Sequence, residues 1–562
     1  MKQHPRALAC ILVLTVSLMC CGVAAGQDYL YIRNSTISET PRIIESPVGS
    51  LGEIDFLDNP AQLRLDSSFR FLSDSYYLGS FSDISTSDVL YDNGQVAPIF
   101  RGQVNGFSEI DGTYCSNYWG MDVGFALEVA SGMNLAFVFN YLYGDVRGDA
   151  DAFTYTTAPP AGMAFRSWTD REDRFRSNTY ASSLVFSSEV IDSLSLGAGI
   201  TYSYIDESQK NSEYGSFIFY NPGPVGTGIN DFKETLGMKY HDIAPFIGVS
   251  YAPSDMFSIA GSLGMDFSFG SVSKEMFNAI PYAGSTGYTE DVDHGDLDGW
   301  GIQGDIELTV GLNDTLSIPI VLGASYDTMG WNADGMGYGA IDPNGVWYMV
   351  RSEGIVAYDN DFEAWDMNIG AGITYAMDGF ACTFMPMYTH REFSNDYSIF
   401  NRATGAVLPG AGDYIFSQSD KEVVNVLSFD LQVEKTFSDM FAGEFGIRYD
   451  YGWAERDYDV YMLDPWQFAP NNYMDATNSG KGQFHDLTLT TKLSVTPVEN
   501  LAISLSGMVT IPLDSLDYDL SGAAVGMDPA AANWFFRSIG IGRDYRDSTW
   551  VYGGMLELTY EF

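Results

Sequence analysis

The sequence predicts an all-β protein, a single transmembrane antiparallel β-barrel. Three observations predict it: apolar residues recur with period two, short turns alternate with long polar connections, and aromatic residues gather at one level of the predicted strands. A period of two places successive side chains on opposite faces of a strand, whereas a helix requires a period near 3.6.

The composition fits this class and excludes others. The 562 residues include 74 acidic and 28 basic side chains, a net charge of −46, and only 18% of residues are charged. Because so few bases cannot neutralise a phosphate backbone, nucleic acid is excluded as a partner. The apolar fraction of 46% excludes intrinsic disorder, and five cysteines exclude a disulfide scaffold.

Residues 1–26 have the pattern of a cleaved secretory signal peptide. Lys2 and Arg6 precede an apolar run over residues 7–21, and small residues follow as far as Gly26. The run is too short to span a membrane comfortably. Its removal leaves 26 bases against 74 acids. No later stretch is apolar enough for a transmembrane helix, so membrane crossing is assigned to strands within residues 62–562.

The alternation is clearest over residues 119–129, where every odd position is large and apolar and every even position is small or charged. A soluble sandwich also alternates, but its strands are usually only about 5–6 residues long. Short turns at one end and long loops at the other favour an outer-membrane barrel. The pattern predicts sixteen strands, at 62–72, 118–130, 133–144, 177–188, 194–206, 237–251, 257–270, 299–312, 315–326, 361–376, 380–391, 423–435, 439–451, 482–495, 501–511 and 548–562.

Two segments complicate this assignment. Residues 100–107 form either a strand or part of the first loop. At residues 238–243 the apolar phase slips from even to odd positions, which predicts a β-bulge.

Aromatic residues on the apolar phase lie where strands leave or enter the long loops, which predicts an aromatic girdle at a membrane interface. Its predicted members are Trp119, Tyr141, Tyr143, Tyr202, Tyr204, Phe267, Phe269, Trp300, Tyr326, Trp365, Tyr388, Tyr449, Tyr451 and Trp550. Cys115 falls near this level and Cys382 near a short turn, so the two are predicted too far apart for a disulfide.

The inward phase is rich in acids, and we expect it to line the lumen. The lining residues singled out are Asp122, Glu128, Asp305, Glu307, Asp366, Arg448 and Lys492. Sixteen strands leave room for a water-filled lumen, in which carboxylates need no partner. The pattern indicates a channel that prefers cations or hydrophobic solutes and repels anions.

The acids at 290–298 fit no EF-hand loop. They favour a solvated loop, or one bridged to lipopolysaccharide by divalent cations. The histidines at 241, 294, 390 and 485 have no spacing typical of a metal site or a catalytic triad, so we expect neither an enzyme nor a cofactor.

Residues 27–61 precede the first predicted strand and end in Asn59, Pro60 and Ala61, with Leu63 two residues further on. Asn and Pro favour a tight turn. This ending resembles the Asn-Pro-Ala-x-Leu motif of the long-chain fatty-acid transporters of Gram-negative outer membranes. The resemblance implies that 27–61 folds inside the barrel as a hatch. That family usually has fourteen strands, which stands as the alternative count.

The chain ends at Phe562, with Tyr560 on the same phase. This ending resembles the C-terminal signal by which outer-membrane barrels engage the barrel-assembly machinery. The sequence thus predicts an outer-membrane channel, in contact with lipid and lipopolysaccharide, for small hydrophobic solutes such as fatty acids. Two alternatives stay open: a general diffusion porin with a cation-preferring lumen, and a surface barrel that acts as an adhesin or scaffold.

Overall fold

The structure is a computed structural model that describes most of the chain beyond the N-terminal segment. The described residues are 55–65, 67–88, 105–158, 163–220, 224–254, 256–279, 288–336, 340–341, 347–348, 353–401, 414–438, 440–463, 473–498, 500–514, 516–525 and 544–561. The predicted signal peptide, most of the predicted hatch and Phe562 lie outside them.

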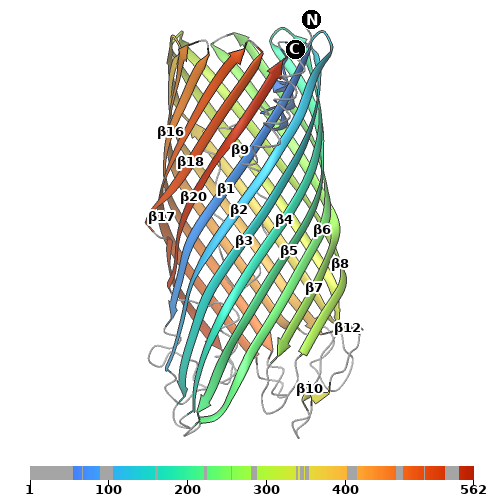
Figure 1. Ribbon diagram of the computed structural model, residues 1–562, viewed down its shortest axis with the longest axis vertical. Coiled ribbons are helices and arrows are strands. Elements are labelled where there is room, and N and C mark those ends of the chain that lie inside the picture. Colours follow the sequence, from blue (N-terminus) through green and yellow to red (C-terminus); the bar gives the residue numbers. More distant parts are fainter. Residues whose placement is uncertain are drawn as a thin grey trace, which may run out of the picture.

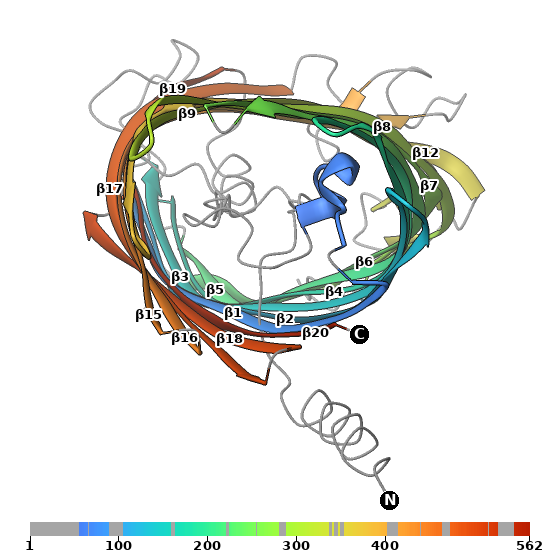
Figure 2. The same ribbon diagram turned by 90° about the horizontal axis from the view of Figure 1, so that it is seen from above.

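The strands form one closed antiparallel barrel (Figures 1 and 2). Strand β1 closes it by pairing with β2 on one side and with the last strand, β20, on the other. The strands are β1 (Phe69–Asp88), β2 (Asn105–Ala130), β3 (Met133–Ala158), β4 (Met163–Ile191), β5 (Leu194–Tyr220), β6 (Pro224–Ser254), β7 (Phe257–Ala279), β8 (Tyr288–Asn313), β9 (Leu316–Met336), β10 (Ala340–Ile341), β11 (Trp347–Tyr348), β12 (Glu353–Ala371), β13 (Ile373–Met377), β14 (Phe380–Asn401), β15 (Tyr414–Ser438), β16 (Phe441–Leu463), β17 (Tyr473–Val498), β18 (Leu501–Asp514), β19 (Leu516–Val525) and β20 (Asp544–Glu561).

The prediction of sixteen strands is confirmed, and the alternative of fourteen is wrong. Elements β12 and β13 are one strand interrupted at Gly372, and β18 and β19 are one strand interrupted at residue 515. The short β10–β11 hairpin lies outside the barrel sheet. No helix among the described residues is long and apolar enough to cross a membrane.

The short turns lie within a few residues of their predicted positions, all at one end of the barrel, which we call the turn end. One of them shows how the sequence forms such a turn. Between β13 and β14, Asp378 has φ 35° and Gly379 has φ 70°. Two successive positive φ values are typical of a two-residue hairpin turn, in which Asp-Gly is a favoured pair.

At the opposite end, the loop end, the strands are much longer than predicted. Strand β3 has 26 residues and β6 has 31. Much of the polar sequence assigned to long loops therefore continues the ladder; β3 and β4 remain paired from Met133–Ser188 as far as Ala158–Met163. The alternation in that region no longer separates lipid from water, so hydropathy alone underestimates the strands.

Two further expectations are wrong, the start of the first strand and the bulge at residues 238–243. The first strand begins at Phe69 instead of residue 62, because residues 60–62 form a 3₁₀ turn inside the barrel. Within the segment 100–107, which the sequence left open between strand and loop, residues 105–107 belong to β2. No bulge lies at residues 238–243: β6 keeps one register with β5 across the segment, and Met238 and Tyr240 are buried on the inward face.

The outward face carries the predicted apolar residues and the aromatic girdle. Phe125 is 41% exposed and Ile369 is 47% exposed, as expected for side chains that face lipid. In the girdle, ring centroids lie 5.2 Å apart between Trp119 and Tyr141 and 4.9 Å apart between Tyr141 and Tyr180. The ring contacts continue around the barrel, for example between Trp300 and Tyr326, Trp365 and His390, and Tyr451 and His485.

Three histidines that carried no predicted role belong to this girdle. Tyr202 and Tyr449 bring their hydroxyl groups within 2.8 and 2.5 Å of Nδ1 of His241 and His485, and His390 Nδ1 lies 2.8 Å from Asn425 Oδ1. Both cysteines within the described residues, Cys115 and Cys382, are free, as predicted.

Candidate functional site in the barrel lumen

Two short 3₁₀ turns, η1 (Asp55–Leu57) and η2 (Pro60–Gln62), lie inside the ring of strands, drawn in blue in Figure 2. We call residues 55–65 the luminal segment. Asn59 caps η2, since its side-chain Oδ1 accepts a hydrogen bond of 3.1 Å from the Ala61 amide. Its Nδ2 group donates to the carbonyl of Val249 on β6, at 3.3 Å. The motif residues are thus held by both their own turn and the wall.

Two glycines in the barrel wall leave space for this turn. Gly197 on β5 and Gly248 on β6 are direct partners in the strand register. A Cβ atom at Gly197 would collide with the Pro60 backbone, and one at Gly248 would collide with the Asn59 side chain and lie 2.8 Å from Pro60 Cδ. The absence of side chains here lets the motif approach the sheet closely.

Polar side chains of three neighbouring strands fasten the end of the motif. The Leu63 carbonyl accepts hydrogen bonds from Ser187 Oγ at 2.6 Å and from Asn134 Nδ2 at 3.0 Å. Arg64 Nη2 donates to Ser195 Oγ at 3.3 Å. A buried carbonyl without partners is costly. The contacts at Leu63 therefore favour this one position of the segment.

The luminal segment also buries an apolar face against the wall. Phe56 is 4% exposed and Leu63 is 2% exposed. They pack with inward-facing residues of β1 to β4 and of β6, namely Leu72, Ala126, Ala136, Val138, Val185 and Phe246. This small core on the inner side of a barrel exists because the segment covers it.

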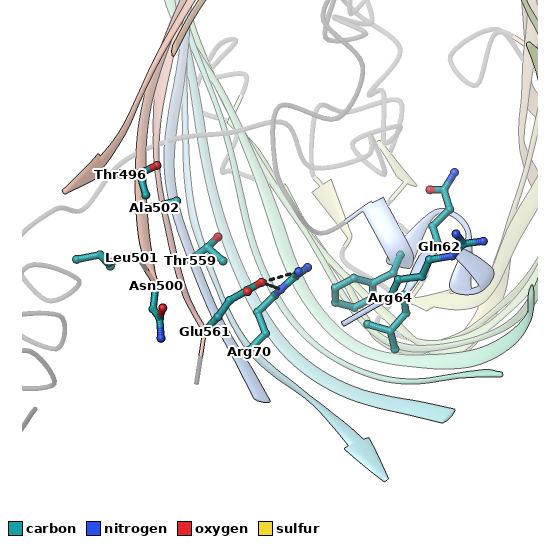
Figure 3. Close-up of a pocket in the computed structure, with 11 residues that line it drawn as sticks. Gln62, Arg64, Arg70, Thr496, Asn500, Leu501, Ala502, Thr559 and Glu561 are labelled. Carbon is teal, nitrogen blue, oxygen red and sulfur yellow. Dashed lines mark hydrogen bonds and ion pairs between the residues drawn. The ribbon is translucent and has the colours of Figure 1, made fainter. Parts of the chain in front are cut away.

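Beside the luminal segment lies a cavity of about 510 Å³ (Figure 3). Gln62 and Arg64 line it on one side, and the turn-end residues of β17, β18 and β20 line it on the other. Arg70 and Glu561 form an ion pair of 2.6 Å at its edge. The luminal segment therefore occupies part of the lumen at the turn end and leaves a polar cavity beside it.

The predicted lining residues fall into two groups. In the first group, carboxylates accept hydrogen bonds from uncharged donors or are exposed. Asp122 accepts a hydrogen bond from Asn140, Glu128 accepts one of 3.3 Å from the Gly132 amide, and Asp305 one of 3.5 Å from Ser262. The remaining acid, Glu307, is exposed on β8.

In the second group, carboxylates are paired with bases. Arg448 bonds to Asp450 at 2.8 Å and to Ser428 at 2.9 Å, and Lys492 pairs with Glu557 at 2.9 Å. Asp366 pairs with Arg391, a residue that sequence reasoning missed. A carboxylate in a water-filled lumen needs no partner, yet the barrel places Arg391 of β14 beside Asp366.

Beyond the girdle, toward the loop end, the inward face becomes apolar. We call this cluster the luminal apolar belt: Ile205, Leu236, Met238, Tyr240, Val272, Leu297, Trp331 and Ala333, from β5 to β9. A second patch continues on β12 and β14 with Phe362, Ala364 and Phe393. The signal for the belt in the sequence is the even phase of Met238 and Tyr240, which by itself predicts a bulge and not an inward apolar face.

A buried acid adjoins the belt. Glu207, beyond the girdle on β5, is 2% exposed and accepts long hydrogen bonds of 3.5 Å from Ser177 Oγ and Tyr240 OH. Burial raises the pKa of its carboxyl to about 8. The carboxyl is therefore protonated at neutral pH, and it can donate a hydrogen bond where the belt ends.

The chain is similar to several solved structures. No protein-family model and no curated protein matches the chain. Similar solved structures include a Pseudomonas aeruginosa FadL homologue (11% identity, TM-score 0.33, covering 90% of this chain and 94% of that one). The Ralstonia pickettii toluene transporter TbuX is similar at 11% identity and TM-score 0.33, covering 91% and 94%. Since these identities and TM-scores are low, the function has to be argued from the residues of this chain.

Proposed function

We propose that this protein is an outer-membrane channel for small, uncharged hydrophobic solutes, with the luminal segment as the seated end of an N-terminal hatch. The observation that carries the proposal is the fit of Asn59 and Pro60 over the glycine pair Gly197 and Gly248. A tail outside the barrel, in the periplasm, would not need two glycines in the wall to make room for it. A chain segment held inside a barrel restricts the lumen, and its release widens it.

The luminal apolar belt supports hydrophobic solutes. Water-filled pores are polar inside, whereas Met238, Leu297 and Trp331 form a buried apolar cluster on the inward side of the wall, each at most 7% exposed. A solute that displaces the neighbours of this cluster would bind there because its own apolar surface is removed from water. The belt lies near the loop end, where a solute from outside would arrive first.

The charge pattern supports uncharged solutes over fatty-acid carboxylates. Acids outnumber bases among the predicted lining residues, whereas the protonated Glu207 at the edge of the belt adds no negative charge. A carboxylate that enters would meet negative potential and lose its hydration. A hydroxyl group carries no charge to be desolvated, and one that enters the belt as far as the buried Glu207 can exchange a hydrogen bond with it.

A specific observation also favours the second candidate, a general diffusion porin with a cation-preferring lumen. The cavity beside the luminal segment is polar, and the inward face carries Asp122, Asp305 and Glu307. If the luminal segment leaves this route open, small cations pass without movement of the hatch.

Planar-bilayer conductance separates the two candidates. We expect the full chain to show small conductance and a variant lacking residues 27–63 to show a large one. Isothermal titration of the full chain with octan-1-ol and octanoate, matched in chain length, should show binding of the alcohol only. A full chain that already conducts as well as the deletion variant contradicts the hatch and favours the diffusion porin.

We further propose that the C-terminal strand directs assembly. Tyr560 pairs with Phe71 of β1 and with Leu501 of β18, so the last strand closes the barrel. Recognition of Tyr560 and Phe562 by the barrel-assembly machinery would couple closure to membrane insertion. Truncation of the last three residues should lower the amount of protein in outer-membrane fractions.

A further inference from the structure

Three arginines surround one carboxylate on the outer face of the barrel. Asp145 of β3 pairs with Arg147 at 2.7 Å, with Arg174 at 2.8 Å and with Arg176 at 3.4 Å. We call these three arginines the arginine patch. Burial alone would raise the pKa of Asp145, but hydrogen bonds from Arg174 and Arg147 hold it below its usual value. The carboxylate is therefore ionised and balances one of three positive charges.

The outward direction of the patch follows from the strand phase. Arg147 and Asp145 continue the phase of the girdle residue Tyr143 on β3, and Arg174 and Arg176 continue that of Tyr180 on β4. Their side chains are solvent-accessible: 60% exposed for Arg147, 34% for Arg174 and 45% for Arg176. The carboxylate of Asp145 is only 8% exposed beneath them.

The level of the patch is the level of lipid head groups. Asp145 lies two residues beyond the girdle residue Tyr143, and Arg147 lies four residues beyond it. With a rise of about 3.3 Å per residue along a strand, the guanidinium groups fall within roughly 15 Å of the girdle. Aromatic girdles mark the interface between acyl chains and head groups. The patch therefore faces the head groups and not the acyl chains.

The arginine patch differs from other basic residues on the outer face in its ratio of bases to acids. Lys421 pairs with Glu392 at 2.5 Å, and Lys481 pairs with Glu455, one base to one acid in each case. In the arginine patch, three bases share one acid, and Lys210 of β5 is the register partner of Arg174. The next outward pair along β3 and β4, Asp149 and Glu172, is acidic, but the ion pairs of the three arginines among the described residues all converge on Asp145, so an external anion can balance the charge that Asp145 leaves over.

We propose that the arginine patch binds a phosphate group of a phosphorylated glycolipid in the outer leaflet. Guanidinium groups in a row match phosphate oxygens in bidentate geometry, and the site at the membrane interface is only partly hydrated. One glycolipid phosphate would supply the missing negative charge beside Asp145. The proposal rests on the placement of the barrel in the outer membrane, and on no property of the solute.

The test measures binding of lipid A to the detergent-solubilised full chain by native mass spectrometry. The test variant carries Arg174→Gln and Arg176→Gln; the matched control carries Lys421→Gln and Lys481→Gln. We expect the test variant to bind lipid A at least about tenfold more weakly, as for the loss of charged hydrogen bonds, and the control to bind as the parent does. Lipid A without its two phosphates should bind all three proteins equally.

Two further arms make the result decisive. Asp145→Asn leaves three arginines without their carboxylate, so it should bind lipid A as tightly as the parent or tighter. If Asp145→Asn weakens binding as much as loss of the arginines does, the patch is only structural and the proposal fails. Binding that disappears with a chelator but survives in the arginine variant would assign the lipid to acidic loops and divalent cations, which also overturns it.

The outcome is separable from that of the proposed function. We expect the arginine variant to retain the conductance of the parent, since the patch faces away from the lumen. A chain that binds lipid A through the patch but takes up no hydrophobic solute would refute only the channel. Absence of the chain from outer-membrane fractions would refute both. If the double variant does not fold, Arg147→Gln alone serves, and an unchanged lipid affinity in it contradicts the proposal.

Discussion

Gly197 on β5 and Gly248 on β6 face each other across the sheet, and the turn formed by Asn59 and Pro60 lies directly over both. Neither glycine has a positive φ value, so the backbone does not require glycine at these positions. What requires it is the close approach of a second piece of chain. The pair is thus part of the seat of the luminal segment.

Replacing both glycines with alanine should displace the luminal segment while leaving the barrel intact. Overpacking typically costs about 1–3 kcal/mol, enough to raise the released fraction roughly tenfold. Bilayer conductance of the double variant should therefore approach that of the chain lacking residues 27–63. Gly264→Ala on β7 is the control, because its added Cβ would lie 3.3 Å from the flexible Gln303 side chain. Equal conductance in the double alanine variant and the control would contradict the role of the two glycines in holding the luminal segment.

Arginine on the outward face should be far more costly than arginine on the inward face. Phe125→Arg and Ile369→Arg should each destabilise the barrel by about 2–4 kcal/mol near the bilayer midplane. Thr309→Arg, on the inward phase of β8, is the control and should cost much less. Urea unfolding in liposomes measures the difference. Equal tolerance at the three positions would mean that the apolar face does not meet lipid.

The sequence could predict the strand number and the position of the turns because lipid imposes a strict rule on one face of every strand. Between the turns and the girdle, residues such as Phe125 and Ile369 obey it. Beyond the girdle the rule no longer applies, and there the predictions were incomplete. The lengths of β3 and β6, the inward direction of Met238 and the apolar belt were all missed for this reason.

The partners of individual side chains could not be predicted at all. Arg391 lies beside Asp366, and Ser187 lies beside Leu63, only because distant strands become neighbours in the closed barrel. The motif at Asn59 was recognisable by its resemblance to a family. The glycine pair that it contacts, Gly197 and Gly248, was not recognisable, since glycines are common throughout the chain.

The stability of the barrel should fall as pH rises toward the pKa of Glu207. This pKa is about 8 in the folded protein, against about 4.5 in an unfolded chain. Between these values the folded state holds a proton that the unfolded state has lost, so each pH unit costs up to about 1.4 kcal/mol. Above pH 8 there is no further loss from this group. Urea midpoints at pH 6 and pH 9 should differ less for Glu207→Gln than for the parent; an unchanged difference contradicts a raised pKa.

A polar group in the luminal apolar belt should weaken solute binding and, because Met238 is only 2% exposed, should also lower the stability of the barrel. Met238→Gln keeps the length of the side chain but replaces a thioether with an amide that has to be desolvated. The affinity for octan-1-ol should fall about tenfold, the equivalent of 1.4 kcal/mol. Lys239→Gln is the control, since the neighbouring residue points outward and pairs with Asp206 at 3.5 Å. Similar affinities in both variants would show that the solute does not contact the belt.

The two free cysteines report which end of the barrel faces outward. Cys115 lies beyond the girdle on the loop side, as the register partner of Arg147, whereas Cys382 lies close to the short turn at Asp378. With the loop end outside the cell, a small, membrane-impermeant methanethiosulfonate reagent should label Cys115 in intact cells, and the label should vanish in Cys115→Ser. Cys382, at the opposite end on the lipid-facing phase, should stay unlabelled until the outer membrane is dissolved in detergent. If only lysed cells show labelling at Cys115, the loop end faces the periplasm. The arginine patch would then lie in the inner leaflet, away from phosphorylated glycolipid.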